Sequence, residues 1–421
     1  MVFASDSFIF LFLPVFLVAY GLTPARWRNL TLLGFSWLFY AWWRVDFLPL
    51  IVGIAVWSWV TGLWIARRAD HERGWPLFVA IAGPLAALIW FKYANLFAGT
   101  AIALGTPLTG WQAIVLPIGL SFFVFGAISY SVDVYRGTVP AEPSFINYAT
   151  YQSMFGHLVA GPVVRYQWVA DRLHARAFDR AEFAIGVERF MLGFAQKVLI
   201  ADTLAPMVDA GYALAHPSAA DVALAVLGYT LQLYFDFAGY TWLRDYLYIP
   251  LGGNRGGLWR LCVNLMITMG LGGLWHGASW TFLVWGLWHG LGLMALRLAS
   301  AAGLPKAPAV IGHVTTLLFV MFGWLLFRAQ TWDEFSVALD GLMGANGIAP
   351  SQEFLASLHP TILATLLLGI VMVYVPLIGR FSAPAARFGA VVRLWSALPL
   401  WLLAVWVLQG RIVVPFLYFQ F

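Results

Sequence analysis

Long apolar stretches separated by short polar ones run along the whole chain. They are continuous, without the residue-by-residue alternation of β-barrel strands, and this favours helices. A helix of about 20 apolar residues crosses a bilayer with all its backbone groups bonded internally. We therefore predict an all-α, polytopic membrane protein with about eleven transmembrane helices. Their spans lie near residues 7–21, 29–43, 47–66, 76–98, 111–132, 185–201, 221–238, 279–298, 312–328, 361–378 and 394–409, with weaker candidates near 147–163 and 262–275.

Several of these spans are short or interrupted. The second covers only residues 29–43, and Pro14, Pro84 and Pro117 lie inside others. Proline disrupts a helix, and broken or re-entrant helices within a membrane usually line a cavity. The sequence shows no linker, low-complexity tract or soluble domain, so we expect a single membrane-embedded domain over residues 1–421.

Composition narrows the class further. Of the 421 residues, 62% are apolar and 10% are charged, against about 25% charged in soluble domains. So few charges cannot cover a soluble surface, and the net charge of +5 is spread too thinly for nucleic-acid binding. A soluble enzyme, a disordered protein and a nucleic-acid binder are therefore excluded, and the lipid bilayer is the expected surrounding. The single cysteine, Cys262, permits neither an internal disulfide nor a cysteine-based metal site.

Loop charges predict the orientation of the chain. Basic residues follow the first and third spans and recur in an amphipathic stretch at 165–189, and the positive-inside rule places all three on the cytoplasmic side. The N-terminus then lies outside. The stretch 165–189 suits either an interfacial helix or an ordinary solvated loop helix. The first apolar run, residues 8–20, lacks preceding basic residues and a small-residue cleavage site, so we expect a retained helix.

Candidate chemistry is concentrated between Tyr234 and Gly290. The pentapeptide Gly-Leu-Trp-His-Gly occurs twice, at 273–277 and 286–290. A glycine beside a reactive side chain lets a substrate come close, a tryptophan excludes water, and a neutral imidazole can act as a general base. These features make His276 the catalytic candidate, with Trp275 and His289 as weaker supporting candidates. Alternatively, both histidines bond carbonyl groups at the water–lipid boundary.

The other polar residues of this block have weaker signals. Asp236 lies in an apolar span, and Arg244 and Asp245 follow it among aromatic residues. These three side chains suit a tunnel lining, or Asp236 pairs with Arg244 in a purely structural role. On a continuous helix the thirteen residues between His276 and His289 turn through about 220°, so we expect no joint metal site. The sequence has no phosphate-binding loop, nucleophile elbow or zinc-protease motif.

Taken together, these residues resemble the membrane-bound O-acyltransferase family, and within it the bacterial alginate O-acetyltransferase membrane subunits. The similarity runs nearly end to end, and its most specific block is Gly272-Gly-Leu-Trp-His-Gly277. Other matching blocks are Phe10–Pro14, Phe39–Arg44, Pro117–Phe122, Ser129–Arg136, His157–Pro162, Tyr234–Phe237 and Arg244–Pro250.

The resemblance implies a ring of helices around a central funnel, with the family's catalytic histidine at His276. It implies transfer of an acetyl group from a cytoplasmic thioester, acetyl-CoA, with no permanently bound cofactor. The acetyl group would cross the bacterial inner membrane to extracytoplasmic proteins that O-acetylate an exopolysaccharide such as alginate. The same family includes transfer of D-alanine to teichoic acid and of acetyl groups to peptidoglycan or other glycans, and these remain alternatives.

The sequence departs from the family pattern at one point. In relatives, a few dozen residues with a second signature histidine follow the segment that matches Tyr234–Tyr240. Here Tyr240 is followed directly by Thr241, and His289 does not take the place of that histidine. We therefore predict a missing segment at this junction, whose absence affects activity more than fold.

Two hypotheses from other functional classes stay open at this level. A transporter would bind a solute with the same polar residues, and a scaffold would only dock a polysaccharide-modifying partner. For the acyltransferase, the sequence does not decide whether His276 is a general base or a nucleophile.

Overall fold

We describe the chain from a computed structural model. The residues described are all except 1–2, 4, 109, 159–160, 162, 176–178, 237–245, 247–248, 252–256, 306, 380–382 and 411–421, together with the side chains of 236 and 375–395. The chain forms two compact units, one of residues 1–177 and 238–250 and the other of residues 178–237 and 251–421. This division does not test the single membrane domain expected for residues 1–421, which stays a prediction.

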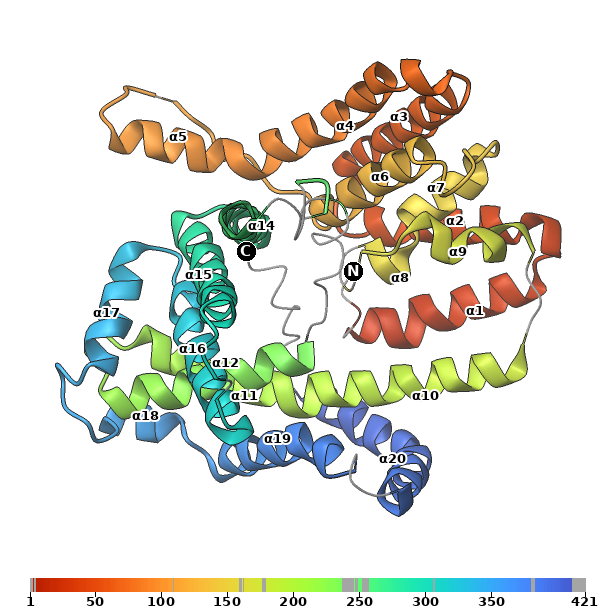
Figure 1. Ribbon diagram of the computed structural model, residues 1–421. Helices are drawn as coiled ribbons and strands as arrows, with labels where there is room; N and C mark the ends of the chain where they lie inside the picture. Colours follow the sequence, from red (N-terminus) through yellow and green to blue (C-terminus); the bar gives the residue numbers. More distant parts are fainter. Residues whose placement is uncertain are drawn as a thin grey trace. The chain divides into compact units, whose positions relative to one another are not determined.

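The described residues are helical and contain no strand, so the all-α prediction is confirmed (Figure 1). Among them, five helices are long and apolar enough to cross a membrane: Val45–Ala66, Gly74–Ala103, Gly257–His276, Trp280–Ala301 and Ala309–Arg328. Shorter apolar helices cover Ser7–Leu22, Leu120–Tyr135, Ala219–Phe235, Pro360–Tyr374 and Ser396–Gln409. The multi-pass membrane class is thus established, while the count of eleven spans stays a prediction.

Three predicted segments differ from the observed ones. Residues 111–119 precede their helix, which starts at Leu120, because Pro117 and the left-handed Gly119 do not continue a helix. Within the candidate 147–163, residues 147–153 and 155–158 belong to two short helices. Within 165–189, residues 166–174 and 180–189 belong to two helices, one in each unit. By contrast, the weak candidate 262–275 is part of a full-length helix.

The first unit begins with α1 (Leu13–Leu22) and α2 (Arg28–Ala41), which lie side by side (Figure 1). Next come α3 (Leu48–Ala66), α4 (Gly74–Leu88), α5 (Ala94–Ala103), α6 (Leu120–Tyr135), α7 (Phe145–Ser153), α8 (Phe155–Leu158) and α9 (Tyr166–His174). Four buried tyrosines form the centre of its core: Tyr130, Tyr148, Tyr151 and Tyr166. A separate group of phenylalanines, Phe8, Phe12, Phe16, Phe39 and Phe155, packs ring against ring.

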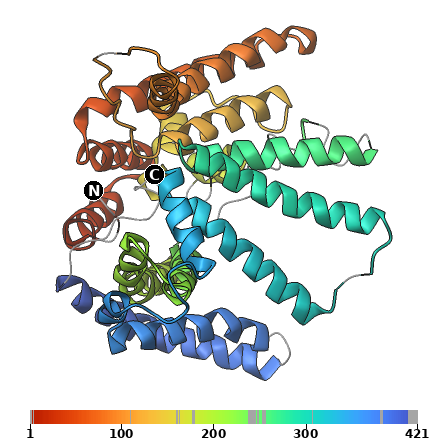
Figure 2. The same ribbon diagram turned by 90° about the vertical axis from the view of Figure 1, so that its left-hand side faces the viewer.

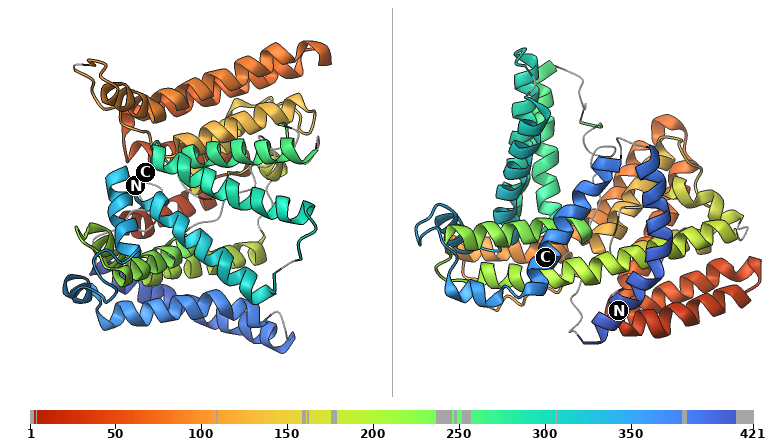
Figure 3. Two further views of the ribbon diagram at one scale, coloured as in Figure 1. Left: turned by 60° about the vertical axis from the view of Figure 1, so that its left-hand side comes forward. Right: turned by 90° about the horizontal axis from the view of Figure 1, so that it is seen from below.

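The second unit starts with a long helical run. It consists of α10 (Arg180–Gln196), a π-helical turn Lys197–Ala201 and α11 (Asp202–Ala213), and α12 (Ala219–Asp236) packs against α11. Next come α14 (Gly257–His276) and α15 (Trp280–Ala301), which form a hairpin, and α16 (Ala309–Arg328) (Figures 2 and 3). The remaining helices are α17 (Trp332–Leu342), α18 (Gln352–Ser357), α19 (Pro360–Gly379) and α20 (Ala383–Gln409).

Candidate active site

His276 is the last residue of α14, at the turn of the α14–α15 hairpin. Ser279 caps α15 by accepting a hydrogen bond from the backbone N–H of Thr281 over 3.3 Å. The same turn is hydrogen-bonded to the end of α16. The Thr281 hydroxyl donates to the carbonyl of Ala329 over 2.8 Å, and the Ser279 hydroxyl donates to the carbonyl of Gln330 over 3.2 Å. These bonds fix the backbone next to His276 against a third helix.

Aromatic rings surround the His276 imidazole. Its centroid lies 4.6 Å from that of Trp275, 5.0 Å from Trp285 and 5.6 Å from Phe327. Trp285 and Phe327 also pack on each other at 4.8 Å. Because aromatic walls exclude water, the imidazole lies in a less polar surrounding than bulk solvent provides.

A cavity of about 300 Å³ opens beside His276. Its lining comes from α12, α14, α15 and α16, and consists of Thr230, Leu233, Tyr234, His276, Trp285, Val320, Trp324 and Phe327. The Thr230 hydroxyl donates to the carbonyl of Val226 over 2.7 Å, within its own helix. His276 is the basic group on this mostly apolar wall, and the cavity is at the lower end of the size range of small-molecule sites.

The two histidines of the repeated pentapeptide have different surroundings. His289 lies on α15, 4.9 Å from Trp285 and 5.8 Å from Phe319 between ring centroids, and does not line the cavity. Its Nε2 is buried, has no hydrogen-bond partner among the described residues and faces Gly323 of α16. His276 and His289 therefore contact the same ring, that of Trp285, but only His276 reaches the cavity.

The remaining sequence-predicted residues divide into two groups. Trp275 is buried beside His276, and its supporting role stays a prediction. Asp236 is the last residue of α12, but its side chain, Arg244 and Asp245 lie outside the described residues. Their role in a tunnel lining stays a prediction.

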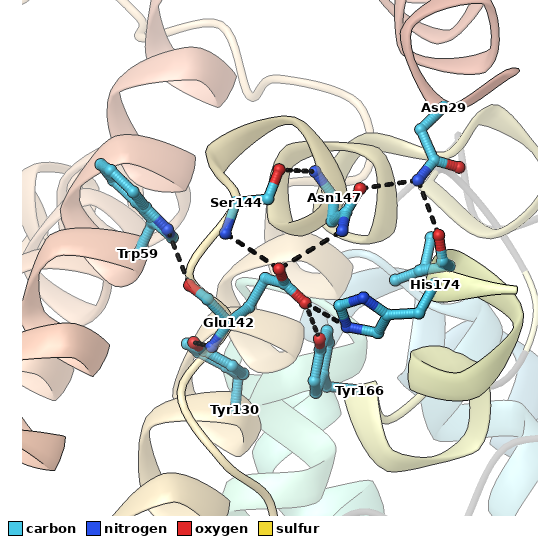
Figure 4. A network of polar contacts seen from close by, with 9 residues as sticks. Asn29, Trp59, Tyr130, Glu142, Ser144, Asn147, Tyr166 and His174 are labelled. Carbon is cyan, nitrogen blue, oxygen red and sulfur yellow. Dashed lines mark hydrogen bonds and ion pairs between the residues drawn. The ribbon is translucent and has the colours of Figure 1, made fainter. Parts of the chain in front are cut away.

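The first unit contains a buried polar network that the sequence analysis missed, centred on Glu142 (Figure 4). The Glu142 side chain is fully buried, and Oε1 accepts hydrogen bonds from the Ser144 backbone over 2.9 Å and Asn147 over 3.3 Å. Oε2 accepts from the Tyr166 hydroxyl and lies 2.8 Å from Nε2 of His174. Burial raises the pKa of Tyr166, and its bond to Glu142 raises it further.

A second polar cluster of this unit lies around Tyr246. The Tyr246 hydroxyl donates to the buried Asp133 over 2.8 Å, and the guanidinium groups of Arg165 and Arg136 lie over its ring at 5.0 and 5.6 Å. Burial and the bond to Asp133 raise the pKa of Tyr246. Asp133 and Glu142 were detectable only as isolated acids in or near apolar stretches, since nothing in their spacing showed which residues would approach them.

Comparison with known proteins identifies the family of this sequence. The family model described as MBOAT, membrane-bound O-acyltransferase family, matches residues 230–331. This range contains every residue that lines the cavity beside His276.

Curated relatives match most of the chain. The "Probable alginate O-acetylase AlgI" of Azotobacter vinelandii is 40% identical over 430 positions, covering 91% of this chain and 86% of that protein. The protein of the same name from Pseudomonas aeruginosa is 42% identical, covering 78% of this chain and 72% of its own length. The "Peptidoglycan O-acetyltransferase" of Helicobacter pylori is 29% identical, covering 83% of this chain and 81% of that protein.

The first alignment is longer than the part of this chain that it covers, since 430 positions exceed 91% of 421 residues. Several tens of positions in the Azotobacter protein therefore have no counterpart here. This length agrees with the missing segment that we predict, while its location between Tyr240 and Thr241 stays a prediction.

Proposed function

The chain belongs to the membrane-bound O-acyltransferase family, and from this premise we propose that it moves an acetyl group from a cytoplasmic thioester, acetyl-CoA, across the membrane for O-acetylation of an exopolysaccharide. The observation that carries the proposal is His276 on the wall of an aromatic cavity inside the family-matched range. Alginate is the favoured acceptor, because relatives named as alginate O-acetylases are 40–42% identical and the peptidoglycan enzyme is 29% identical.

In the proposed reaction His276 acts as a general base. A neutral imidazole nitrogen removes the proton of the acceptor hydroxyl, whose oxygen attacks the thioester carbonyl. The carbon–sulfur bond then breaks, an ester forms, and the leaving thiolate takes the proton from the imidazolium. The walls of Trp285, Trp324 and Phe327 keep water from competing with the hydroxyl.

The proposal includes a cellular setting. The chain is a multi-pass membrane protein, and we place it in the bacterial inner membrane, with the donor on the cytoplasmic side. Extracytoplasmic polysaccharide O-acetylation proteins are the proposed partners that receive the acetyl group. The alginate O-acetylases named among its relatives support this setting.

The test uses membranes of an alginate-producing bacterium in which this chain is the sole O-acetylase. We expect His276→Ala to lower transfer from labelled acetyl-CoA by at least about 10²-fold, the usual contribution of a general base, with unchanged protein level and melting temperature. The matched control is His313→Ala, because His313 is exposed on α16 and bonds Tyr374 outside the cavity. Full transfer by a normally folded His276→Ala protein would reject the role.

The nucleophile alternative makes a different prediction. If His276 attacks the thioester itself, acid quenching of the wild-type protein with labelled acetyl-CoA traps an acetylated protein, which His276→Ala abolishes. General-base catalysis leaves no labelled protein.

A further inference from the structure

The two copies of Gly-Leu-Trp-His-Gly meet each other in the α14–α15 hairpin, whose helices run side by side (Figure 3). A Cβ added to Gly273 would lie 2.1 Å from the carbonyl oxygen of Phe282 and 3.0 Å from Cα of Gly286. A Cβ added to Gly286 would lie 2.1 Å from the carbonyl oxygen of Met269 and 3.0 Å from Cα of Gly273. The first glycine of each copy therefore touches the first glycine of the other.

This contact is reciprocal. Phe282 precedes Gly286 by four residues, and Met269 precedes Gly273 by four, so each glycine lies over the equivalent carbonyl of the opposite helix. The last glycines face the partner helix as well: a Cβ on Gly277 would lie 2.2 Å from the Phe282 ring, and one on Gly290 would lie 2.9 Å from Sδ of Met266. Small residues four apart let helices in a membrane approach closely.

The side chains around this crossing are not symmetric. Trp285 directly precedes Gly286, whereas the equivalent position before Gly273 is another glycine, Gly272. The ring centroid of Trp285 lies 5.0 Å from that of His276 and 4.9 Å from that of His289. The distance between α14 and α15 at the two glycines thus sets how His276 meets Trp285.

We propose that the repeated pentapeptide is a reciprocal helix crossing in which Gly273 and Gly286 are positioning residues that hold His276 against Trp285 on the cavity wall. His289 packs against Trp285 and takes no part in the chemistry. A methyl group at either glycine would meet backbone atoms, which cannot rotate away as a side chain can, so the two helices would have to separate. The proposal rests on the proposed function only through His276 as the reacting group.

The experiment compares two glycine-to-alanine variants of the full chain. Gly286→Ala places a methyl group against the Met269 carbonyl, and a misplacement of about 1 Å can cost about 10²-fold in rate. We expect kcat for transfer from labelled acetyl-CoA to alginate to fall by about that factor, with KM for acetyl-CoA changed less than about threefold. The control is Gly270→Ala, whose Cβ would meet only side-chain atoms, of Leu287 at 3.1 Å and of Leu283 at 3.5 Å, and whose kcat stays within about twofold of wild type.

A structural measurement separates this proposal from the proposed function. In a structure of Gly286→Ala in lipid nanodiscs, we expect the distance between the His276 and Trp285 centroids to exceed 5.0 Å. An unchanged distance would overturn the proposal whatever the activity. If the wild-type protein transfers no acetyl group, the proposed function fails, and the structural measurement still decides the helix crossing.

If Gly286→Ala does not fold, a milder variant still tests the proposal. A Cβ at Gly290 would lie 2.9 Å from Sδ of Met266 and 3.3 Å from Cβ of Met269, and we expect Gly290→Ala to have a several-fold lower kcat that a second change, Met266→Ala, restores in large part. Restoration supports the crossing, because a general loss of stability would not be relieved by removing a further core side chain. A folded Gly286→Ala or Gly290→Ala protein with wild-type kcat contradicts it.

Discussion

The buried side chain of Glu142 depends on neighbours from several segments of the chain. Glu142 has bonds from residues of the α6–α7 loop, of α7 and of α9, and its own backbone N–H donates to the Tyr130 hydroxyl over 2.9 Å. The Trp59 indole donates to its carbonyl over 2.9 Å. A fully buried carboxyl group is costly unless such partners satisfy it. Glu142 therefore joins several segments of the first unit through one side chain (Figure 4).

Removing this carboxyl group should destabilise the protein. Glu142→Ala leaves the Tyr166 hydroxyl, the Asn147 amide and the Ser144 N–H without their acceptor, and we expect a loss of about 3 kcal/mol. The melting temperature in detergent measures it. Glu353→Ala is the control, because Glu353 is exposed on α18, and we expect a change below about 0.5 kcal/mol. Equal melting temperatures for the two variants would disprove the network's contribution.

A π-helical turn interrupts the long helical run at the start of the second unit. The π-helical turn Lys197–Ala201 separates α10 from α11 and holds a buried ion pair, in which Nζ of Lys197 lies 2.5 Å from Oδ1 of Asp202. π-Helical turns insert one extra residue into a helix. Here the turn joins two helices, with Lys197 at its start and Asp202 directly after its end.

Breaking this buried pair should cost more than breaking a surface pair. Lys197→Met leaves the Asp202 charge buried with one partner fewer, and we expect a loss of about 3–5 kcal/mol. The double variant Lys197→Met/Asp202→Leu should recover most of it, since an apolar pair of similar volume replaces both charges. Thermal unfolding checks both variants. Asp209→Asn is the matched control on α11, because the Asp209 side chain is 68% exposed in its pair with Arg328, and it should cost less than about 1 kcal/mol.

Across the chain, two of the segments whose charges predict the orientation lie close together. Asn29, next to the basic residues after the first span, donates to Asn147 over 2.6 Å and to the carbonyl of Leu173 over 2.8 Å. The segment after the first span and the start of the stretch 165–189, both of which the charge rule places on the cytoplasmic side, are thus in contact in the first unit. The sides of the membrane themselves stay a prediction.

Cysteine labelling tests that orientation directly. In a Cys262→Ser background, we expect Arg26→Cys, Arg67→Cys and Asp171→Cys to react with a membrane-impermeant maleimide only after cells are permeabilised, because the charge rule places these exposed residues inside. Thr106→Cys, in the loop after α5, should react in intact cells. Labelling of the first three from outside would reverse the orientation.

The sequence by itself determined the membrane class, most of the helical segments and His276 as the candidate base, because apolar runs and local motifs depend on nearby residues. Although the two pentapeptides are identical, the Gly272–Gly277 block of the family resemblance already favoured His276 over His289. Only tertiary packing gave the two histidines different surroundings: Trp285 and α16 leave His276 facing a cavity and enclose His289. It also turned the weak, glycine-rich span 262–275 into a full helix, because those glycines, poor for an isolated helix, fit the close approach of α15.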